Sequence, residues 1–343
     1  MTETILVTGA GGFIARHVIL ALLRQGYCIR GTVRDAAKSE TVRTGLAAHD
    51  KAASDAARLS FVAADLTSDD GWRDAAAGCA AVMHVASPFP MSQPRDRNAL
   101  TPAAKGGALR VINAALDAGV PRIVMTASMV TMMYRPNRPP ITPVTEKDWT
   151  DIGWSALSAY VVSKTEAERA AWSLVEERAA KMRLTTIHPG FVLGPALDAD
   201  FGTSIGVIKM FMTGAYPATP PVAYPVVDVR DVADLHVAAL KAPATGGRRL
   251  IAAGGAMSMA EMAAAIRRAA PERSKKVPTA TMPEFLVRLL AHVDRNLASV
   301  VPDLGARPKP MADYVTELTG LKFRTPEAAT AATVDSLIRH AVV

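Results

Sequence analysis

The sequence is poor in cysteine and in aromatic residues, and it has no long apolar run. Its two cysteines, Cys28 and Cys79, have no second Cys or His at metal-ligand spacing, so we expect packing residues rather than a disulfide framework or a metal site. No apolar stretch approaches the about 20 residues of a membrane-spanning helix. The first expected strand begins almost at once and leaves no room for a signal peptide. These absences favour a cytoplasmic protein that binds neither a metal nor a membrane.

Acidic residues are too few to balance the basic ones. The chain has 39 Lys and Arg against 32 Asp and Glu, a formal net charge of +7. The basic residues are scattered, and the one dense patch is Arg273-Ser274-Lys275-Lys276. Scattered charge is typical of a solvated surface, and attraction of a phosphorylated cofactor is a better functional interpretation than nucleic-acid binding. We therefore expect no nucleic-acid partner.

Short apolar, β-branched runs alternate with longer amphipathic stretches through the first two-thirds of the chain. The expected strands are Ile5–Thr8, Cys28–Val33, Leu59–Ala63, Ala81–Val85, Arg122–Thr126, Leu184–His188 and Val226–Asp228. The expected helices include Ala15–Gln25, Gly106–Ala118 and Ala159–Met182. Such alternation is typical of βαβ units. We therefore predict an α/β fold with a doubly wound parallel sheet, covered by helices on both faces.

The pattern loosens after about residue 190, where prolines break up short segments and helices later predominate. We expect the sheet-containing domain to comprise residues 1–190 and 226–247. A smaller, mostly helical substrate-binding region would comprise residues 191–225 and 248–343, laid over the ligand-binding edge of the sheet.

A glycine-rich turn follows the first expected strand and opens a helix, which is the context of a dinucleotide-binding fingerprint. Gly9 permits a tight turn, Gly12 lets the backbone approach a pyrophosphate, and Ala15 allows close helix–sheet packing. The pyrophosphate would lie at the helix N-terminus, where free N–H groups and the helix dipole favour an anion. The first expected cofactor-binding residues are therefore Thr8, Gly9, Gly11, Gly12, Phe13 and Ile14.

Basic residues follow the second expected strand and favour NADP(H) over NAD(H). An acidic residue at this place would bind the ribose 2′-hydroxyl of NAD, whereas an Arg accommodates a 2′-phosphate. Arg34 would offer a planar fork and Lys38 a point charge, although Asp35 between them could contact a ribose hydroxyl. Asp65 and Leu66 would border the adenine, and Ala86 and Ser87 the other side of the cofactor.

Tyr160 and Lys164 stand four residues apart at the start of a helix, so they share one helix face. A nearby ammonium would lower the pKa of the phenol toward working pH and make it a general acid for a carbonyl oxygen. Ser128, after the fifth expected strand, would enter the same crevice and hydrogen-bond the substrate oxygen. The bare Tyr–Lys pair is a weak signal, and its weight comes from this serine.

These landmarks resemble the extended short-chain dehydrogenase/reductases, and specifically the dihydroflavonol reductase, cinnamoyl-CoA reductase and bacterial aldehyde reductase group. The matching segments are Gly9–Ala15, Thr32–Asp35, His84–Pro88, Ser128, Tyr160 with Lys164, His188–Gly190 and Asp228–Ala233. Two departures are Ala15, where glycine is common, and Ala127, where a second serine is common.

The resemblance implies a Rossmann fold, a catalytic triad of Ser128, Tyr160 and Lys164, and NADPH-dependent reduction of an aldehyde or ketone by hydride transfer. It also implies that Lys164 holds the nicotinamide ribose. Further cofactor contacts are expected from Val85, Thr126, Pro189, Gly190 and Val192.

The expected substrate is a small apolar or aromatic carbonyl compound. The candidate pocket residues are Phe89, Met129, Tyr134, Phe191, Met210 and Tyr224, although the methionines could equally fill the core. Three alternatives stay open: an NAD-dependent sugar-nucleotide epimerase or dehydratase, a hydroxysteroid-type dehydrogenase, and a non-catalytic NADP-binding sensor. The sequence leaves the oligomeric state open, with a homodimer as one option.

Overall fold

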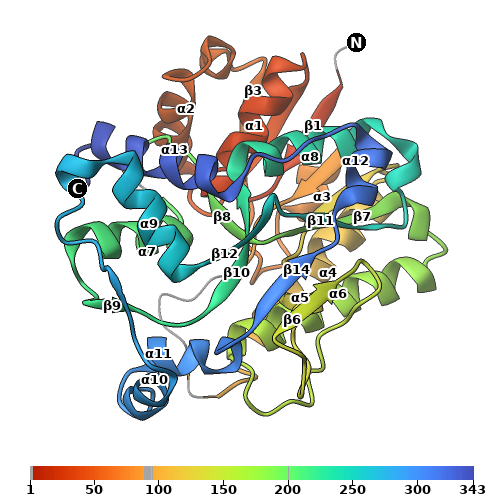
Figure 1. The fold of residues 1–343 in the computed structure, drawn as a ribbon. Coiled ribbons are helices and arrows are strands. Elements are labelled where there is room, and N and C mark those ends of the chain that lie inside the picture. Colours follow the sequence, from red (N-terminus) through yellow and green to blue (C-terminus); the bar gives the residue numbers. More distant parts are fainter. Residues whose placement is uncertain (1–2, 89–93, 95, 200) are drawn as a thin grey trace.

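The computed structural model describes residues 3–88, 94, 96–199 and 201–343. Its centre is a sheet of seven strands, all of them paired in parallel (Figure 1). The strands are β1 (Thr4–Val7), β2 (Cys28–Val33), β3 (Leu59–Ala63), β4 (Ala81–His84), β5 (Ile123–Thr126), β7 (Leu184–Pro189) and β11 (Arg249–Ala252). The predicted α/β fold is confirmed.

The strand order places a crevice at the centre of the sheet. The order is β11-β7-β5-β4-β1-β2-β3, so the chain moves outward from β1 to β3 and then returns to β4 on the other side of β1. In sheets of this kind, ligands bind at the carboxyl ends of the strands where the order reverses. The end of β1 therefore lies beside the end of β4, where Val7 pairs with Met83.

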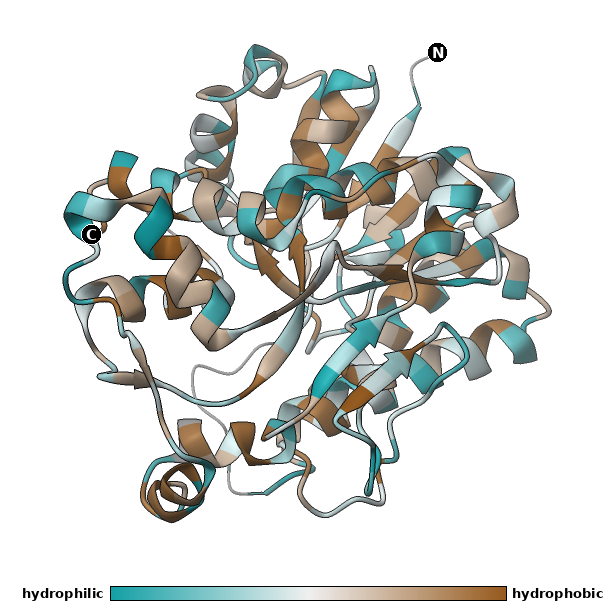
Figure 2. Ribbon diagram, in the orientation of Figure 1, coloured by the Kyte–Doolittle hydropathy of each residue, from teal (hydrophilic) through white to brown (hydrophobic). Residues whose placement is uncertain are grey.

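Helices cover both faces of the sheet, because its strands are apolar on both sides. Helices α1 (Phe13–Arg24) and α8 (Val229–Lys241) pack against each other and contribute to one core cluster. The opposite cluster contains residues of α3 (Trp72–Ala76), α4 (Thr101–Asp117) and α6 (Ala159–Glu177). Figure 2 shows the strands between these layers as strongly hydrophobic.

A smaller lobe lies beside the carboxyl edge of the main sheet (Figure 1). Its three-stranded sheet has the order β12-β10-β8, formed by β8 (Phe191–Leu193), β10 (Ala223–Asp228) and β12 (Gly255–Ser258). Helices α7 (Thr203–Thr213), α9 (Met259–Ala269) and α13 (Pro326–Arg339) pack around it. The remaining elements are α2 (Ser39–Ala47), α5 (Val130–Met133), β6 (Ile141–Val144), β9 (Ala218–Thr219), β13 (Ala280–Thr281), α10 (Glu284–Leu290), α11 (Arg295–Val300), β14 (Arg307–Pro310) and α12 (Asp313–Thr319).

Two strands depart from the expected arrangement. Val226–Asp228 is a strand, but it belongs to β10 in the small sheet, where Val226 pairs with Phe191. The seventh strand of the main sheet is instead β11, which lies in the region expected to bind substrate and pairs with β7. Strand β11 has only four residues, Arg249–Ala252, and begins with a charged one, so it does not stand out in the sequence as an apolar run. The proposed division into two domains stays a prediction.

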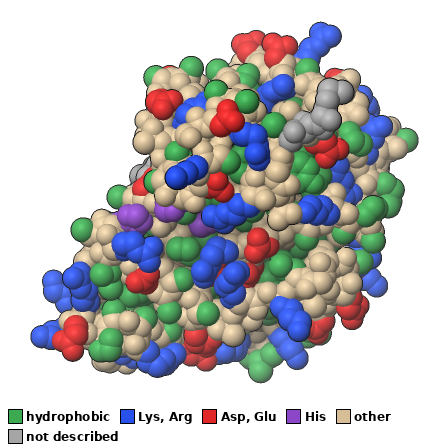
Figure 3. Space-filling model, turned by 90° about the horizontal axis from the view of Figure 1, so that it is seen from above, with side chains coloured by type: hydrophobic (Ala, Val, Ile, Leu, Met, Phe, Trp, Pro, Cys, Tyr) green, Lys and Arg blue, Asp and Glu red, His purple; other side chains and the backbone are tan. Residues whose placement is uncertain are grey.

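The surface and the thiols offer few special features. Cys28 and Cys79 are both free, and Cys79 is buried. No helix among the described residues has the length and apolar character needed to cross a membrane. On the face seen in Figure 3, Lys and Arg side chains are interspersed with Asp and Glu rather than gathered into one basic patch.

Candidate active site

The turn between β1 and α1 has the conformation expected of a phosphate-binding loop. Gly9 has a φ of +68°, and an added Cβ would meet the Cβ of Ala86 at 2.9 Å, so only glycine fits. Gly12 differs, because its φ of −75° is open to any residue and an added Cβ would meet only the Gly9 carbonyl oxygen, at 3.3 Å. The first turn of α1 has no acidic residue and no side-chain cap at Gly12. Its N-terminal N–H groups are therefore suited to an anionic ligand.

Buried hydroxyl groups hold this loop in place. The backbone N–H of Gly9 donates to Thr32 Oγ1 at 2.9 Å, and that of Ala86 donates to Thr8 Oγ1 at 2.9 Å. Thr8 Oγ1 lies 3.0 Å from His84 Nδ1. Burial lowers the pKa of His84 to about 3, so its ring is neutral and can accept the threonine hydrogen. His84 thus has a structural role, and the loop between β1 and α1 is tied to the end of β4.

The end of β2 exposes the residues expected to select the cofactor. Arg34 and Lys38 are both exposed. The carboxylate of Asp35 accepts the backbone N–H of Ala37 at 2.9 Å and caps the 3₁₀ turn Ala36–Lys38. Asp35 therefore has a local structural partner, which favours the two basic side chains as the ligand-binding groups. Backbone and side-chain hydrogen bonds from Thr67, together with the charge of Arg34, lower the pKa of Asp65.

Ser128 and Tyr160 come together at the carboxyl end of β5. Ser128 follows β5, is 8% exposed, and begins the turn into α5. Tyr160 stands in the first turn of α6, which Ser158 caps by accepting the backbone N–H of Val161. The side chains of Ser128 and Tyr160 are hydrogen-bonded to each other. The structure therefore brings the expected proton donor and the expected oxygen-positioning group into contact.

The expected effect of Lys164 on Tyr160 is not what the structure shows. Burial raises the pKa of Tyr160, and the hydrogen bond with Ser128 only partly opposes this. Lys164 Nζ lies 6.0 Å from the centroid of the Tyr160 ring. The prediction of a lowered phenol pKa is therefore wrong for the protein alone. A phenol that stays protonated is still a competent proton donor.

Lys164 is itself strongly affected by its surroundings. Burial lowers its pKa to about 8, although the negative charge of Glu168 opposes the shift. The ammonium lines a small cavity under the carboxyl ends of β4 and β5, together with Leu66, Ala86, Ser87 and Thr126. Residues expected to contact the cofactor from four separate segments thus share one cavity.

The segment after β7 runs close to the small sheet. The backbone N–H of Gly190 donates to Ala252 O at 3.0 Å. An added Cβ at Gly190 would collide with the Pro225 carbonyl, so the close approach of β10 explains this glycine. Pro189 accepts the backbone N–H of Met129 at 3.0 Å, and Val192 is 8% exposed within β8. Pro189 therefore lies next to the Ser128 turn, whereas Gly190 contacts β11 and β10, and Val192 pairs with Val227 of β10.

Two tyrosines expected in the substrate pocket meet at one buried carboxylate. The hydroxyl groups of Tyr134 and Tyr224 donate to Asp303 Oδ2 at 3.1 and 3.0 Å. Arg138 donates to Asp303 Oδ1 at 2.9 Å and lies over the Tyr134 ring at 4.9 Å. Phe191 stacks on Tyr224 with a centroid separation of 6.0 Å. These contacts form a wall made of Tyr134, Phe191, Tyr224 and Asp303, which we call the aromatic wall.

The other pocket candidates are less clearly placed. Met129 is 1% exposed in a cluster with Met132, Met133 and Val144, as expected of a methionine that fills the core. Met210 is partly exposed on α7. Phe89 lies outside the described residues.

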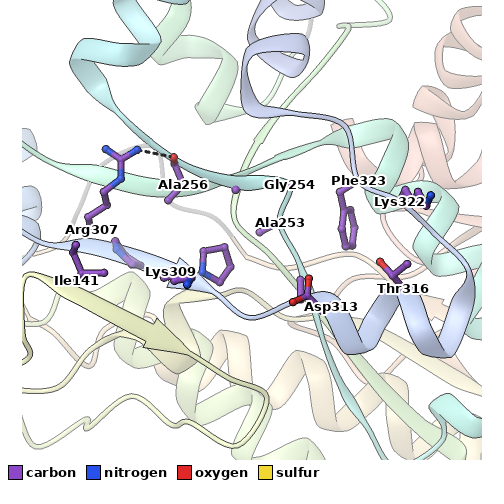
Figure 4. Close-up of a pocket in the computed structure, with 14 residues that line it drawn as sticks. Ile141, Ala253, Gly254, Ala256, Arg307, Lys309, Asp313, Thr316, Lys322 and Phe323 are labelled. Carbon is purple, nitrogen blue, oxygen red and sulfur yellow. Dashed lines mark hydrogen bonds between the residues drawn. The ribbon is translucent and has the colours of Figure 1, made fainter.

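A second cavity, of about 540 Å³, lies away from these residues, between the turn 253–256, β14 and α12 (Figure 4). Its lining contains Arg307, Lys309, Asp313 and Phe323, and the Arg307 guanidinium donates to Ala256 O at 3.2 Å. None of the residues expected for catalysis or cofactor binding lines it. It therefore adds nothing to the candidate active site.

Sequence reasoning missed Asp303 and Arg138. Asp303 is the last residue of the 3₁₀ helix Val301–Asp303 and lies 169 residues after Tyr134 in the sequence. No motif marks it. The one available signal was an acidic residue, directly after Pro302, in a mostly apolar stretch.

A family model for the NAD dependent epimerase/dehydratase family matches residues 5–254. The chain belongs to this family. The match covers the main sheet, the Ser128 turn and the helix that carries Tyr160 and Lys164. Membership of the extended short-chain dehydrogenase/reductase group, which the motifs predicted, is confirmed.

The similar curated proteins are reductases. The chain is 35% identical to Cinnamoyl-CoA reductase 1 of Arabidopsis thaliana over 254 residues, which are 73% of this chain and 70% of that protein. It is 34% identical to Ketoreductase azaE of Aspergillus niger over 307 residues, covering 83% and 88% of the two chains. Among solved structures, Gre2 of Candida albicans in complex with NADPH has a TM-score of 0.78 at 26% identity, covering 98% and 99% of the two chains.

Proposed function

We propose that this protein is an NADPH-dependent carbonyl reductase that converts an aldehyde or ketone to an alcohol by reversible hydride transfer. The observation that carries the proposal is the meeting of Ser128, Tyr160 and Lys164 at the carboxyl ends of the central strands, beside the phosphate-binding loop. Curated relatives named as reductases, at 32–36% identity, and a 26% identical NADPH complex with the same fold support it.

The residues around the crevice fit a dinucleotide. The backbone conformation at Gly12 is open to any residue, and besides the nearby Gly9 carbonyl oxygen the approach of a pyrophosphate would account for a glycine at this place. The N-terminus of α1 would hold that pyrophosphate, and Arg34 with Lys38 would hold a 2′-phosphate. Lys164 would hold the nicotinamide ribose from the cavity that it shares with Ser87 and Thr126. Bound NADPH supplies the hydride.

Three side chains would perform the remaining chemistry. Ser128 would donate a hydrogen bond to the substrate carbonyl oxygen and hold it beside Tyr160. Tyr160, protonated because of its raised pKa, would deliver the proton to that oxygen as its negative charge develops. Lys164, as an ammonium, would stabilise the phenolate that remains. Burial around Ser128 and Tyr160 limits water and strengthens each of these interactions.

The substrate would be a small compound with an apolar or aromatic group. The parallel rings of Phe191 and Tyr224 offer a flat apolar surface, and the Tyr134 and Tyr224 hydroxyl groups place polar atoms beside it. An NAD-retaining epimerase is the less favoured alternative, because Arg34 and Lys38 are exposed where a 2′-phosphate would bind and Asp35 is used as a cap.

A parallel assay of the two reduced cofactors tests the proposal. Absorbance of reduced nicotinamide is followed with NADPH and with NADH across aryl aldehydes, ketoesters, a cinnamoyl thioester and a dihydroflavonol. Carbonyl-dependent oxidation of NADPH well ahead of NADH is the expected result. Consumption of neither cofactor, together with NAD that copurifies with the protein, would contradict the proposal and favour the epimerase alternative.

A further inference from the structure

The fully buried carboxylate of Glu168 lies on the face of α6 that also carries Tyr160 and Lys164. Glu168 stands one helical turn after Lys164 and two turns after Tyr160, so the three residues follow one face of α6. Its side chain is completely buried. Burying an isolated, ionised carboxylate costs folding free energy, and such a group would normally become protonated instead. Its presence therefore calls for strong partners.

Those partners come from three other places in the fold. On β7, His188 Nε2 lies 2.7 Å from Glu168 Oε1, and Thr186 donates to the same oxygen at 3.3 Å. On β11, Arg249 donates to both carboxylate oxygens, at 2.8 and 3.1 Å. Trp172 donates from the next turn of α6 at 3.2 Å. Burial alone would raise the pKa of Glu168, but the hydrogen bonds from His188 and Arg249 and the charge of Arg249 outweigh it and lower that pKa, so Glu168 is an anion at working pH values.

Arg249 extends this network to the turn that carries Ser128. Its NH2 group donates to Thr131 Oγ1 at 3.2 Å, and Thr131 Oγ1 donates to the Ser128 carbonyl oxygen at 2.9 Å. The guanidinium lies flat over Trp149 at 3.8 Å from the ring centroid, which fixes its orientation. Glu168, which is part of α6, is therefore linked through Arg249 and Thr131 to the turn that carries Ser128.

We propose that Glu168 is a positioning residue for the catalytic triad: its carboxylate stabilises the Lys164 ammonium and, through Arg249 and Thr131, fixes the turn that holds Ser128. This inference rests on the proposed function, because it gives Lys164 a role at the cofactor. The charged and titratable groups around Lys164 are Tyr160 and Glu168 on α6 and His84 on β4, while Arg249 and His188 face Glu168 from β11 and β7. His84 is neutral, so Glu168 is the anion among them that favours the ammonium.

The direction of the electrostatic effect follows from the charges. With Glu168 present, the pKa of Lys164 is about 8. Loss of the anion removes a stabilising partner of the ammonium, so the pKa of Lys164 should fall by roughly one pH unit. Near pH 8 the wild-type lysine is about half charged, whereas in Glu168→Gln it would be mostly neutral. At about pH 6 both would be charged, and the difference should largely disappear.

The experiment measures the ionisation of Lys164 directly, in the full-length protein. Competitive labelling with acetic anhydride is followed across a pH series by mass spectrometry of the peptide that contains Lys164. NADPH affinity is measured over the same series by cofactor fluorescence. Glu168→Gln should show the lowered lysine pKa and a severalfold weaker NADPH affinity near pH 8 that recovers toward pH 6. Glu166→Gln, which removes an equal charge two residues away on the same helix, should match the wild type.

Two further variants separate the electrostatic role from a structural one. Glu168→Asp keeps the negative charge, so the pKa of Lys164 should stay close to its wild-type value. The double variant Glu168→Gln with Arg249→Met removes both charges of the buried pair, so neither partner is left as an unpaired charge in the core, although the hydrogen bonds from Arg249 to the Glu146 and Asp148 carbonyl oxygens are lost. The lysine pKa in this double variant should stay low. If Glu168→Gln alone does not fold, the comparison of Glu168→Asp with the double variant gives the same test.

Two outcomes would overturn the proposal. One is an unchanged Lys164 pKa in the variants that lack the carboxylate. The other is a loss of NADPH affinity that is equal at all pH values and is recovered in the double variant, which a purely structural Glu168 would give. Neither readout needs a carbonyl substrate. A protein that reduces no carbonyl but shows the lysine shift would therefore refute the proposed function and leave the role of Glu168 intact.

Discussion

The phosphate-binding loop and the aromatic wall are built by different kinds of contact. The loop is a backbone structure, in which Gly9 adopts a φ of +68° and nearby hydroxyl groups fix the turn. The aromatic wall is a side-chain structure, in which Tyr134 and Tyr224 meet at Asp303 across 169 and 79 residues of sequence. The proposed cofactor site therefore depends on local sequence, whereas the proposed substrate site depends on residues that only the folded chain brings together.

This difference teaches where each kind of substitution should act. A change in the loop should weaken cofactor binding with any substrate, because every substrate meets the same cofactor. A change in the aromatic wall should alter the choice of substrate and leave cofactor affinity intact. The Ser128–Tyr160 pair belongs to neither region, and its loss should affect turnover rather than either binding step.

Among the variants that compare the loop, the aromatic wall and the Ser128–Tyr160 pair, the largest effect is expected for Ser128→Ala. Removing the hydroxyl that positions the carbonyl oxygen should lower kcat by about 100-fold or more. Stopped-flow kinetics and NADPH titration measure the two steps separately. NADPH affinity should stay within about twofold of wild type, and Ser54→Ala, at an exposed hydroxyl far along the chain, should change neither. An Ser128→Ala variant with normal kcat would remove this residue from the catalytic triad.

A smaller but still large effect is expected for Gly12→Val in the phosphate-binding loop. The backbone at Gly12 has an ordinary φ of −75°, so a side chain there causes no backbone strain, but its Cβ would lie 3.3 Å from the Gly9 carbonyl oxygen and the loop must shift slightly to make room. The side chain would occupy the space of the pyrophosphate and weaken NADPH binding by at least about tenfold. Thermal unfolding and cofactor titration check the two halves of this prediction. Normal NADPH affinity in a folded variant would place the pyrophosphate elsewhere.

The double variant Arg34→Ala with Lys38→Ala should reduce the preference for NADPH over NADH by about tenfold, because both partners of the 2′-phosphate are lost. The ratio of kcat/KM for the two cofactors is the measurement. Lys51→Ala, which removes an exposed positive charge outside the site, is the matched control. An unchanged ratio would show that other residues choose the cofactor.

The smallest effect is expected for Asp303→Asn in the aromatic wall. The amide keeps the shape of the carboxylate, and its oxygen can still accept the Tyr134 and Tyr224 hydroxyl groups. Its NH2 group then faces Arg138 and leaves that buried guanidinium without an anion, so the variant should also unfold at a lower temperature. KM for the carbonyl substrate should rise about threefold, with NADPH affinity unchanged, since the cost is about 0.6 kcal/mol. A loss of NADPH affinity in this variant would show that the aromatic wall also affects cofactor binding, against the division of roles proposed for the two regions.

The same comparison explains what could be predicted from the sequence. The strands and the glycine turn could be predicted, because apolar runs and Gly9 record local requirements of the backbone. The edge strand β11 could not be predicted, because its charged residue Arg249 is buried only through its pairing with Glu168, which is distant in the sequence. The pKa of Tyr160 was predicted in the wrong direction, because four-residue spacing places Lys164 over the ring and says nothing of burial.

The most direct test of the central claim follows a deuterium atom. NADPH carrying deuterium at the transferable C4 position is incubated with wild-type protein and with Tyr160→Phe, using the best carbonyl substrate, and the alcohol is examined by mass spectrometry. We predict that the wild-type product gains one deuterium at the carbinol carbon. Tyr160→Phe should bind NADPH normally and form almost no product. Alcohol formed without deuterium, or normal turnover by Tyr160→Phe, would contradict the account.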